Sequence, residues 1–430
     1  MKTKEKSIKS KKSKAGKIAL GIFGGIFGLM AVVVIVGAIV SSVGNKANTE
    51  KALSFETVQY EEQLVPEKDE NGYYTFTTDR DLRVMQLTDI HIGGGWMSLK
   101  KDAMALNAVA AMVTAEKPDL VIVTGDIAYP VPFQAGTFNN LSSARIFAQL
   151  MEKLGVYWTL CFGNHDTESY SYYSREDLSE FYSDEDMKYC LYEAGPEDVD
   201  GYGNQIINVK NTQGIITQSI YIFDSHSYMG GDVLGVMQNY DSIHENQVQW
   251  YKDTLSLYNT QNDKLYESLG KDAKSDIKST AFFHIPFSEY KDAWFEYMEN
   301  GHKDTENVRY RFGVMGESGR LIYCSMGEDM LFETMLELGS TQAVFCGHDH
   351  ENNFSINYKG IDLNYGMSVD YLAYPGIAKL GSQRGCTIIN FAPDGSYTHV
   401  NENYYQEKYT ALYDKEDVTM QEVVHTVPAE

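Results

Sequence analysis

The feature that most constrains this chain is a series of mostly apolar runs, each of which stops at a polar cluster. The runs are 82–87, 119–124, 156–162, 279–284 and 343–346, and 219–224 is a further strand candidate. The clusters are Asp89-Ile90-His91, Gly125-Asp126, Gly163-Asn164-His165-Asp166, His284 and Gly347-His348-Asp349-His350. Short runs of this kind are typical of strands buried in an α/β domain.

Helical patterns separate the first strands. Residues 102–115 place Met104, Ala108 and Met112 on one helical stripe, and a second helix, 141–155, ends at a glycine. Strands that alternate with helices predict an α/β fold with parallel strands and right-handed crossovers. Ligands bind beyond the carboxyl ends of such strands, so we expect the polar clusters to meet at one rim.

The spacing within the clusters suits two metal ions. In extended backbone, residues i and i+2 point the same way, so Asp89 and His91 can hold one ion. His348 and His350 have the same spacing, which fits ions about 3.5–4 Å apart, each with one imidazole. The two carboxylate oxygens of Asp126 can bridge the ions.

The remaining polar residues complete a hydrolytic site. Asn164 offers a neutral oxygen, and His165, its neighbour, is expected to point toward the substrate. Nitrogen and oxygen ligands without thiolate favour Mn, Fe or Zn. Two divalent ions, two aspartates and one hydroxide leave a charge of about +1, which would attract a phosphoryl group while the bound hydroxide attacks it. His165 could then protonate the leaving oxygen as general acid.

The N-terminus has the composition of a membrane anchor. Residues 1–17 contain eight lysines and one glutamate, and residues 18–43 contain no charge. An uncharged run of this length predicts a transmembrane helix, with 1–17 in the cytoplasm and the rest outside the cell membrane. A signal peptide cut near Ser42 is the alternative. Gly21/Gly25 and Gly24/Gly28 have the GxxxG spacing of weak helix dimers.

The rest of the chain reads as a polar stem (44–75), a catalytic domain (76–410) and an acidic tail (411–430). The whole chain carries a charge of −24 and the first 17 residues carry +7, so the remainder carries −31. A body this acidic repels nucleic acids, and no nucleic-acid partner is expected. The five cysteines form no CxxC pair, which argues against a thiolate metal site.

These clusters resemble the calcineurin-like metallophosphoesterase superfamily, whose pattern D-x-H, G-D, G-N-H-D/E, H, G-H-x-H is present over about residues 80–395. The resemblance implies two packed mixed β-sheets flanked by helices and a dinuclear metal centre. It assigns one ion to Asp89, His91, Asp126 and His350. It assigns the other ion to Asp126, Asn164, His284 and His348, and the catalytic role to His165.

The stretches "FGNHDTES", "FFHIPFSEY" and "FCGHDHENNF" are similar to the branch related to purple acid phosphatases. Those enzymes lack the histidine of D-x-H and bind ferric iron through a tyrosine. Here His91 is present, so Tyr129 is expected to line the pocket. Asp166 and Glu168 are both candidates to orient His165, and His226 is the weakest ligand candidate.

The substrate is a phosphate ester, but monoester and diester remain open. A non-catalytic metal-binding surface protein is the alternative function. Loops vary on a rigid rim, so segments 170–192 and 287–340 are the expected specificity elements.

Overall fold

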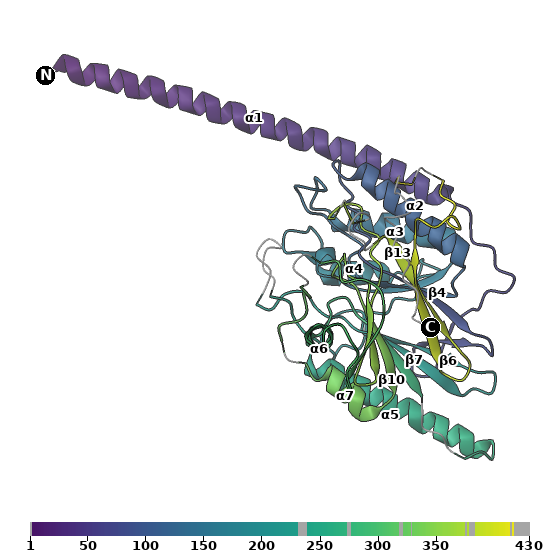
Figure 1. The fold of residues 1–430 in the computed structure, drawn as a ribbon. Helices are drawn as coiled ribbons and strands as arrows, with labels where there is room; N and C mark the ends of the chain where they lie inside the picture. Colours follow the sequence, from purple (N-terminus) through teal and green to yellow (C-terminus); the bar gives the residue numbers. More distant parts are fainter. Residues whose placement is uncertain are drawn as a thin grey trace.

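The computed structural model describes residues 2–230, 239–272, 277–317, 321–327, 329–374, 376–377, 383–412 and 415–416. Two mixed β-sheets lie face to face among these residues (Figure 1). The first sheet has the order β1 (Glu67–Lys68), β2 (Tyr74–Thr77), β6 (Gln205–Lys210), β7 (Ile216–Ile222), β8 (Lys278–Phe282), β10 (Thr341–Cys346), β12 (Ile361–Tyr365), β11 (Ser355–Tyr358), β9 (Val308–Phe312). The second has the order β14 (Tyr397–Asn403), β13 (Gly385–Phe391), β3 (Leu82–Leu87), β4 (Leu120–Thr124), β5 (Tyr157–Cys161).

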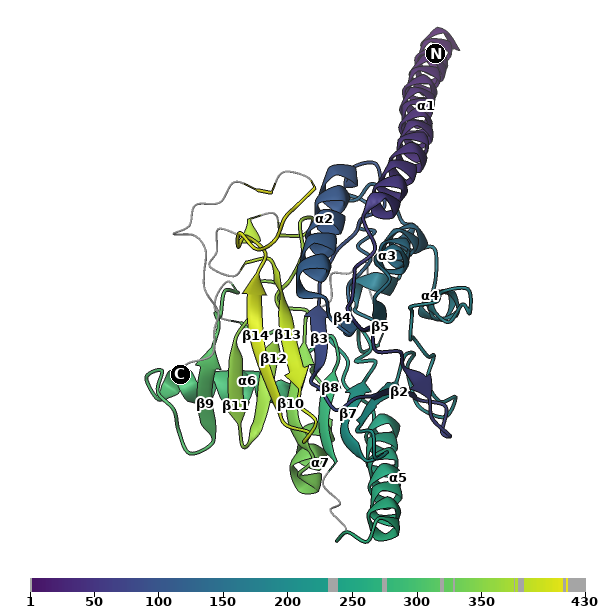
Figure 2. The same cartoon turned by 90° about the vertical axis from the view of Figure 1, so that its right-hand side faces the viewer.

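Helices cover the outer faces of both sheets (Figure 2). The helices are α1 (Lys2–Ser54), α2 (Leu99–Glu116), α3 (Asn140–Leu154), α4 (Arg175–Tyr182), α5 (Glu245–Ser268), α6 (Ser288–Glu299) and α7 (Leu331–Leu338). Side chains of α2 and α3 share one core with β3, β4 and β5. Side chains of α5, α6 and α7 share another with β7, β8 and β10. A third core between the sheets includes Val84, Ile122, Phe282 and Phe345.

The sandwich confirms the predicted fold class. Strands β3, β4 and β5 are parallel, as the strand–helix alternation predicts. Strands β7, β8, β10 and β12 are parallel as well. The two parallel sets therefore present several carboxyl ends at one edge of the sandwich, which is where polar clusters follow the strands.

The segment predicted as a stem is part of the folded body. Helix α1 continues to Ser54, and Ala52, Phe55 and Val58 are buried in the core shared with α2 and α3. Strands β1 and β2 then add to the edge of the first sheet. A few apolar residues in a polar stretch are enough to dock this segment, because the outer face of α2 and α3 offers them an apolar surface.

The N-terminal part of α1 projects away from the body (Figure 1). Its stretch Gly16–Ser54 is long and apolar enough to cross a membrane, and only 6% of its most apolar window is buried. A signal sequence would have the same properties. Most of the predicted acidic tail, at 413–414 and 417–430, lies outside the described residues.

Candidate metal centre

The polar clusters meet at the carboxyl ends of five strands. Asp89 follows β3, Asp126 follows β4, Asn164 and His165 follow β5, His284 follows β8, and His348 and His350 follow β10. The buried amide of Gln86 connects the two sheets close to these clusters. Its Nε2 donates to Cys346 O (3.0 Å) at the end of β10 and to Thr124 Oγ1 (2.9 Å) at the end of β4. Two sheets thus contribute to one site.

Glycines before the clusters allow the chain segments to touch. A Cβ on Gly163 would lie 2.1 Å from Asp126 Oδ1, and one on Gly347 would lie 1.9 Å from Thr88 Oγ1. Neither space can admit a side chain, so any larger residue would push a cluster away from the centre.

The backbone of the clusters departs from the extended geometry that the sequence suggests. Asp89, His91, Asp126 and His348 all have φ between 49° and 77°, in the left-handed region. Asp89 and His91 therefore converge through strained turns and not through strand alternation. Non-glycine residues in this region cost free energy and concentrate at functional sites.

One half of the centre consists of Asp89, His91 and His350, and we call it the carboxylate half. Together with Asp126, these residues offer ligand atoms that all lie within 4.8 Å of one another, and all four are buried. His91 Nε2 lies 3.2 Å from Asp126 Oδ2. His350 Nε2 lies 3.5 Å from Asp89 Oδ1.

The other half consists of Asn164, His284 and His348, and we call it the neutral half. His284 Nδ1 lies 2.8 Å from the carbonyl oxygen of Thr124, so its Nε2 faces the centre. That Nε2 lies 3.2 Å from Asn164 Oδ1, 3.3 Å from His348 Nδ1 and 3.3 Å from Asp126 Oδ2. Asp126 Oδ2 thus faces both halves.

This donor set fits metal ions. A proton on His284 Nε2 can point well at only one of its three neighbours, whereas a cation between them would contact all four atoms. Nitrogen and carboxylate or amide oxygen atoms are ligands for Mn, Fe or Zn. The two halves, joined through Asp126, could hold two such ions.

The buried charged groups of the centre shift one another's pKa values strongly. Burial would lower the pKa of His91, but Asp370 and Asp126 outweigh it and raise that pKa to about 10. Burial likewise opposes the effect of Asp126 on His284, whose pKa rises to about 9. The pKa of His348 falls well below its usual range because of burial and of His284. Protons on the first two rings would leave when cations bind.

Asp370 is a residue that the sequence reasoning missed. It is fully buried, and its carboxylate lies 3.3 Å from His91 Nδ1 and 3.5 Å from His350 Nδ1. Burial would raise its pKa, but His91 and His350 hold it well below the usual range. Asp370 therefore contacts the Nδ1 atoms of both imidazoles of the carboxylate half, on the side of each ring that faces away from the centre. In metal sites this arrangement fixes the orientation of the rings.

His165 stands outside both halves. Its ring is partly exposed, and its Nδ1 lies 2.8 Å from Glu168 Oε1. Asp166, the other candidate partner, instead accepts hydrogen bonds from the amides of Gly163, Asp126 and Ala128. Glu168 is therefore the partner that orients the His165 ring. Asp166 holds the loop after β4 against the loop after β5.

Tyr129 and His226 make contacts of other kinds. The Tyr129 hydroxyl donates to Gln134 Oε1 (2.6 Å) while its ring stacks on His91, so Tyr129 lines the pocket as predicted. His226 contacts Gln247 Oε1 through Nε2 (3.0 Å) and stacks on His244. His226 does not join either half.

A cavity of about 170 Å³ opens over the centre. Its lining includes Tyr129, His165, Tyr240, His348 and His350. A phosphoryl group fits a cavity of this size, whose lining includes tyrosine rings as well as His165.

Comparison with known proteins identifies the family. A family model described as calcineurin-like phosphoesterase matches residues 82–352, and this chain belongs to that family. The match spans the strands and clusters that build the candidate metal centre. The family assignment confirms the resemblance found in the sequence.

Individual relatives are purple acid phosphatases and a phosphatase. "Probable inactive purple acid phosphatase 28" of Arabidopsis thaliana is 26% identical over 70% of this chain and 73% of its own length. "Phosphatase DCR2" of Saccharomyces cerevisiae is 28% identical over 65% of this chain and 46% of its own length.

Among solved structures, a dimetal phosphatase from Danio rerio aligns with 13% identity and a TM-score of 0.46, over 75% of this chain and 96% of that one. Purple acid phosphatase PPD1 from yellow lupin (Lupinus luteus) seeds aligns with 12% identity and a TM-score of 0.39, over 80% of this chain and 57% of that one.

Proposed function

We propose that this chain is a membrane-anchored, extracytoplasmic phosphoesterase that hydrolyses phosphate esters at a centre of two transition-metal ions. One observation carries the proposal. Asp126 Oδ2 lies 3.2 Å from His91 Nε2 and 3.3 Å from His284 Nε2, and these histidines come from different sheets. A carboxylate oxygen between two imidazoles is suited to bridge two cations.

The ligands divide between the ions as the halves do. Asp89, His91 and His350 would hold one ion, Asn164, His284 and His348 the other, and Asp126 both. The ions would be Mn, Fe or Zn. When bound, they would activate a water molecule and neutralise charge on a phosphoryl group.

The chain's own residues supply the proton. Glu168 lies beside Nδ1 of His165, which leaves Nε2 free to face the leaving oxygen in the cavity. His165 would give that oxygen its proton as general acid, and Glu168 would stabilise the ring in its charged form. The role matches the position of His165 outside the ligand set.

Metal analysis and turnover test the proposal together. The full-length protein, purified in detergent and loaded with Mn, Fe or Zn, should bind two ions per chain. It should hydrolyse an aryl phosphate monoester or the matching diester, and the ratio of the two rates identifies the ester class. Two bound ions without turnover of either ester would contradict catalysis, and fewer than two ions would contradict the dinuclear centre.

A non-catalytic metal-binding surface protein is the second candidate. The observation in its favour is that relatives such as "Probable inactive purple acid phosphatase 28" and "Probable inactive purple acid phosphatase 14" are named as inactive. Against it, every ligand residue of the motif is present in the sequence, and four of them bring ligand atoms within 4.8 Å of one another. The turnover assay above separates the two.

The proposed anchor is residues 18–43 of α1, with the lysine-rich segment 1–17 in the cytoplasm. Protease added to intact cells should digest the body and spare the first residues. Protection of the body would contradict this topology, and a mature N-terminus near Ser42 would replace the anchor with a cleaved signal.

The glycines of the proposed anchor are open to a second helix. A Cβ on Gly21, Gly24, Gly25 or Gly28 would meet nothing within 4 Å, so a weak homodimer could form there.

A further inference from the structure

An apolar cavity lies directly beside His165. It has a volume of about 380 Å³, and apart from His165 and Glu168 its lining is apolar or aromatic, with Tyr129, Val131, Phe133 and Phe138 among its residues. His165 and Tyr129 also line the cavity over the metal centre. A leaving group that takes its proton from His165 would therefore extend into apolar surroundings.

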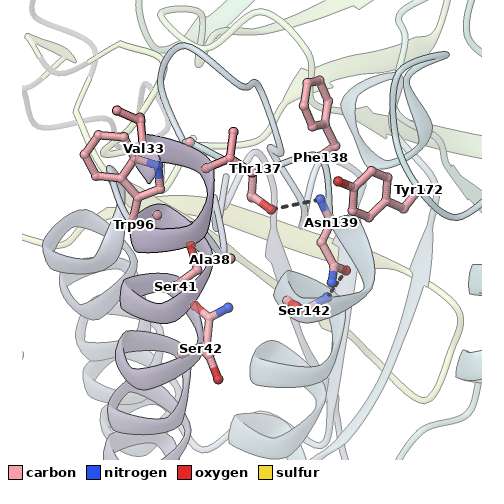
Figure 3. A pocket seen from close by; sticks show the side chains of 14 residues that line it. Val33, Ala38, Ser41, Ser42, Trp96, Thr137, Phe138, Asn139, Ser142 and Tyr172 are labelled. Atoms are coloured by element: carbon pink, nitrogen blue, oxygen red, sulfur yellow. Dashed lines mark hydrogen bonds between the residues drawn. The ribbon is translucent and has the colours of Figure 1, made fainter. Parts of the chain in front are cut away.

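A second cavity lies against α1 (Figure 3). Its volume is about 570 Å³, and its lining combines apolar residues such as Val33, Trp96 and Phe138 with polar ones such as Ser41, Asn45 and Asn139. Phe138 lines both cavities, so they adjoin. In Figure 3, Trp96 lies against α1 while Phe138 and Tyr172 stand on the opposite side of the cavity. Apolar side chains thus occur in both cavities between His165 and α1, and polar side chains also line the second.

The rim of these cavities exposes aromatic rings. The exposed fractions are 89% for Phe133, 69% for Tyr172, 41% for Trp96 and 38% for Phe138. Large exposed apolar groups that gather in one place mark an interaction surface. Aromatic residues are also enriched where proteins meet the membrane–water boundary.

The length of α1 places this rim at the membrane. Between Lys17 and the part of α1 that lines the second cavity there are 15 uncharged residues, Ile18 to Val32. They span about 22 Å, which is less than the roughly 30 Å of a bilayer core. Val33 to Gly37 must then complete the span. A Cβ on Gly37 would lie 2.9 Å from Trp96 Nε1, so Trp96 lies at the same depth.

We infer that the substrate is a phosphoester carried by a lipid of the bilayer that α1 crosses. The phosphate would lie over the metal centre, and the lipid chain would run through the adjoining cavities past Phe138 toward α1. This inference rests on the proposed function, since it names the substrate class of the same site and uses the same anchor.

Turnover of a lipid tests the inference separately from the function. The full-length, metal-loaded protein is placed in phosphatidylcholine vesicles with a minor fraction of phosphatidic acid, and glycerol phosphate and an aryl phosphate serve as soluble substrates. We expect phosphatidic acid or phosphatidylcholine to be cleaved at least about tenfold faster than glycerol phosphate. Aryl phosphate cleavage without this preference would overturn the inference and leave the proposed function standing. No cleavage of any ester would overturn both.

A variant at the exposed rim tests whether the rim causes the preference for lipid over glycerol phosphate. Phe133→Asp should lower the ratio of lipid to glycerol phosphate turnover by about tenfold, because a charge opposes insertion of the rim. Leu257→Asp, at an exposed leucine of α5, is the matched control and should leave the ratio unchanged. An unchanged ratio in Phe133→Asp would overturn the inference.

Tryptophan fluorescence gives a readout that needs neither metal nor turnover. Trp158, Trp250 and Trp294 are buried, so Trp96 is the exposed tryptophan. Brominated phosphatidylcholine in the vesicles should quench the part of the emission that Trp96→Phe removes, and aqueous iodide should not. Quenching by iodide alone would show that the rim faces water and would overturn the inference.

Discussion

The two halves of the candidate centre each contain two histidines and share Asp126, but they are supported in different ways. In the carboxylate half, Asp370 lies within 3.5 Å of both His91 and His350. In the neutral half, the Thr124 carbonyl faces His284, and the Tyr228 hydroxyl accepts a hydrogen bond of 2.9 Å from Asn164 Nδ2. A buried charge supports one half, and uncharged groups support the other.

This difference predicts two unlike ion sites. A buried carboxylate behind an imidazole increases its basicity and fixes its orientation, which strengthens the bond to a metal. The carboxylate half also contains its own aspartate, whereas the neutral half shares Asp126 and has no other carboxylate. We expect the ion of the carboxylate half to bind more tightly and to leave last during chelation.

Removing the shared carboxylate should have the largest effect. Asp126→Ala takes a ligand from both halves, so both ions should be lost and kcat/KM should fall by about 10⁴ or more. Metal analysis and ester turnover measure this, and Asp81→Ala, at an exposed acid before β3, is the control. One ion retained at full affinity would contradict the shared role of Asp126.

His165 belongs to neither half, so its removal should separate catalysis from metal binding. His165→Ala should keep both ions and lower kcat by about 10²–10⁴ with an alkyl phosphate, the usual scale for a general acid. The loss should be smaller for an aryl phosphate, whose leaving oxygen needs little protonation. Loss of an ion would make His165 a ligand, and full activity on the alkyl ester would refute the general-acid role.

A change behind the carboxylate half should affect one ion only. Asp370→Asn keeps the shape of the side chain but removes its charge. The affinity for the ion of the carboxylate half should fall by about 10–100-fold. Tyr228→Phe is the matched change in the neutral half and should weaken the other ion only a few-fold, since it removes one neutral hydrogen bond. Competition with a chromogenic chelator measures both affinities. Equal weakening of the two ions by Asp370→Asn would remove the distinction between the halves.

A titrating group outside both halves should affect the free energy of unfolding without affecting the binding of either ion. Burial lowers the pKa of His399 to about 4, although Asp362 opposes this. The unfolded chain then binds more protons between pH 6.5 and 4, so stability falls as the pH falls through that range. His399→Gln should flatten this part of the profile of the unfolding midpoint against pH, and two ions should still bind at neutral pH. An unchanged slope would contradict a neutral buried His399.

The sequence predicted the strands that precede the polar clusters because an apolar run followed by a polar cluster is a local signal, and the ligand assignment made from those clusters stays a prediction. Strand β3 begins and ends where the apolar run 82–87 does, and the clusters follow their strands directly. Asp370 carries no such signal. It reaches the centre because Ser368 forms a parallel bridge with Thr88, just beyond β3, and Val369 N donates to Thr88 O. That pairing joins distant parts of the chain and depends on how the sheets pack.

The docked segment 44–75 was missed for a related reason. Its composition is polar, and only a few apolar residues, among them Phe55 and Val58, reveal contact with α2 and α3. Glu168 was one of two candidates beside His165, and only the three-dimensional course of the loop, with Asp166 turned toward backbone amides, distinguishes them.

The left-handed backbone at Asp89, His91, Asp126 and His348 bears on how such a chain evolves. Each of these residues costs about 1 kcal/mol or more relative to glycine, which adopts the same φ freely. Glycine would relieve this cost, but at His91 or Asp126 it would also leave a buried charged neighbour without its partner, which costs more. The charge network therefore holds the ligand residues in place even under selection for stability alone, and a laboratory screen for thermal stability would retain the centre as a unit.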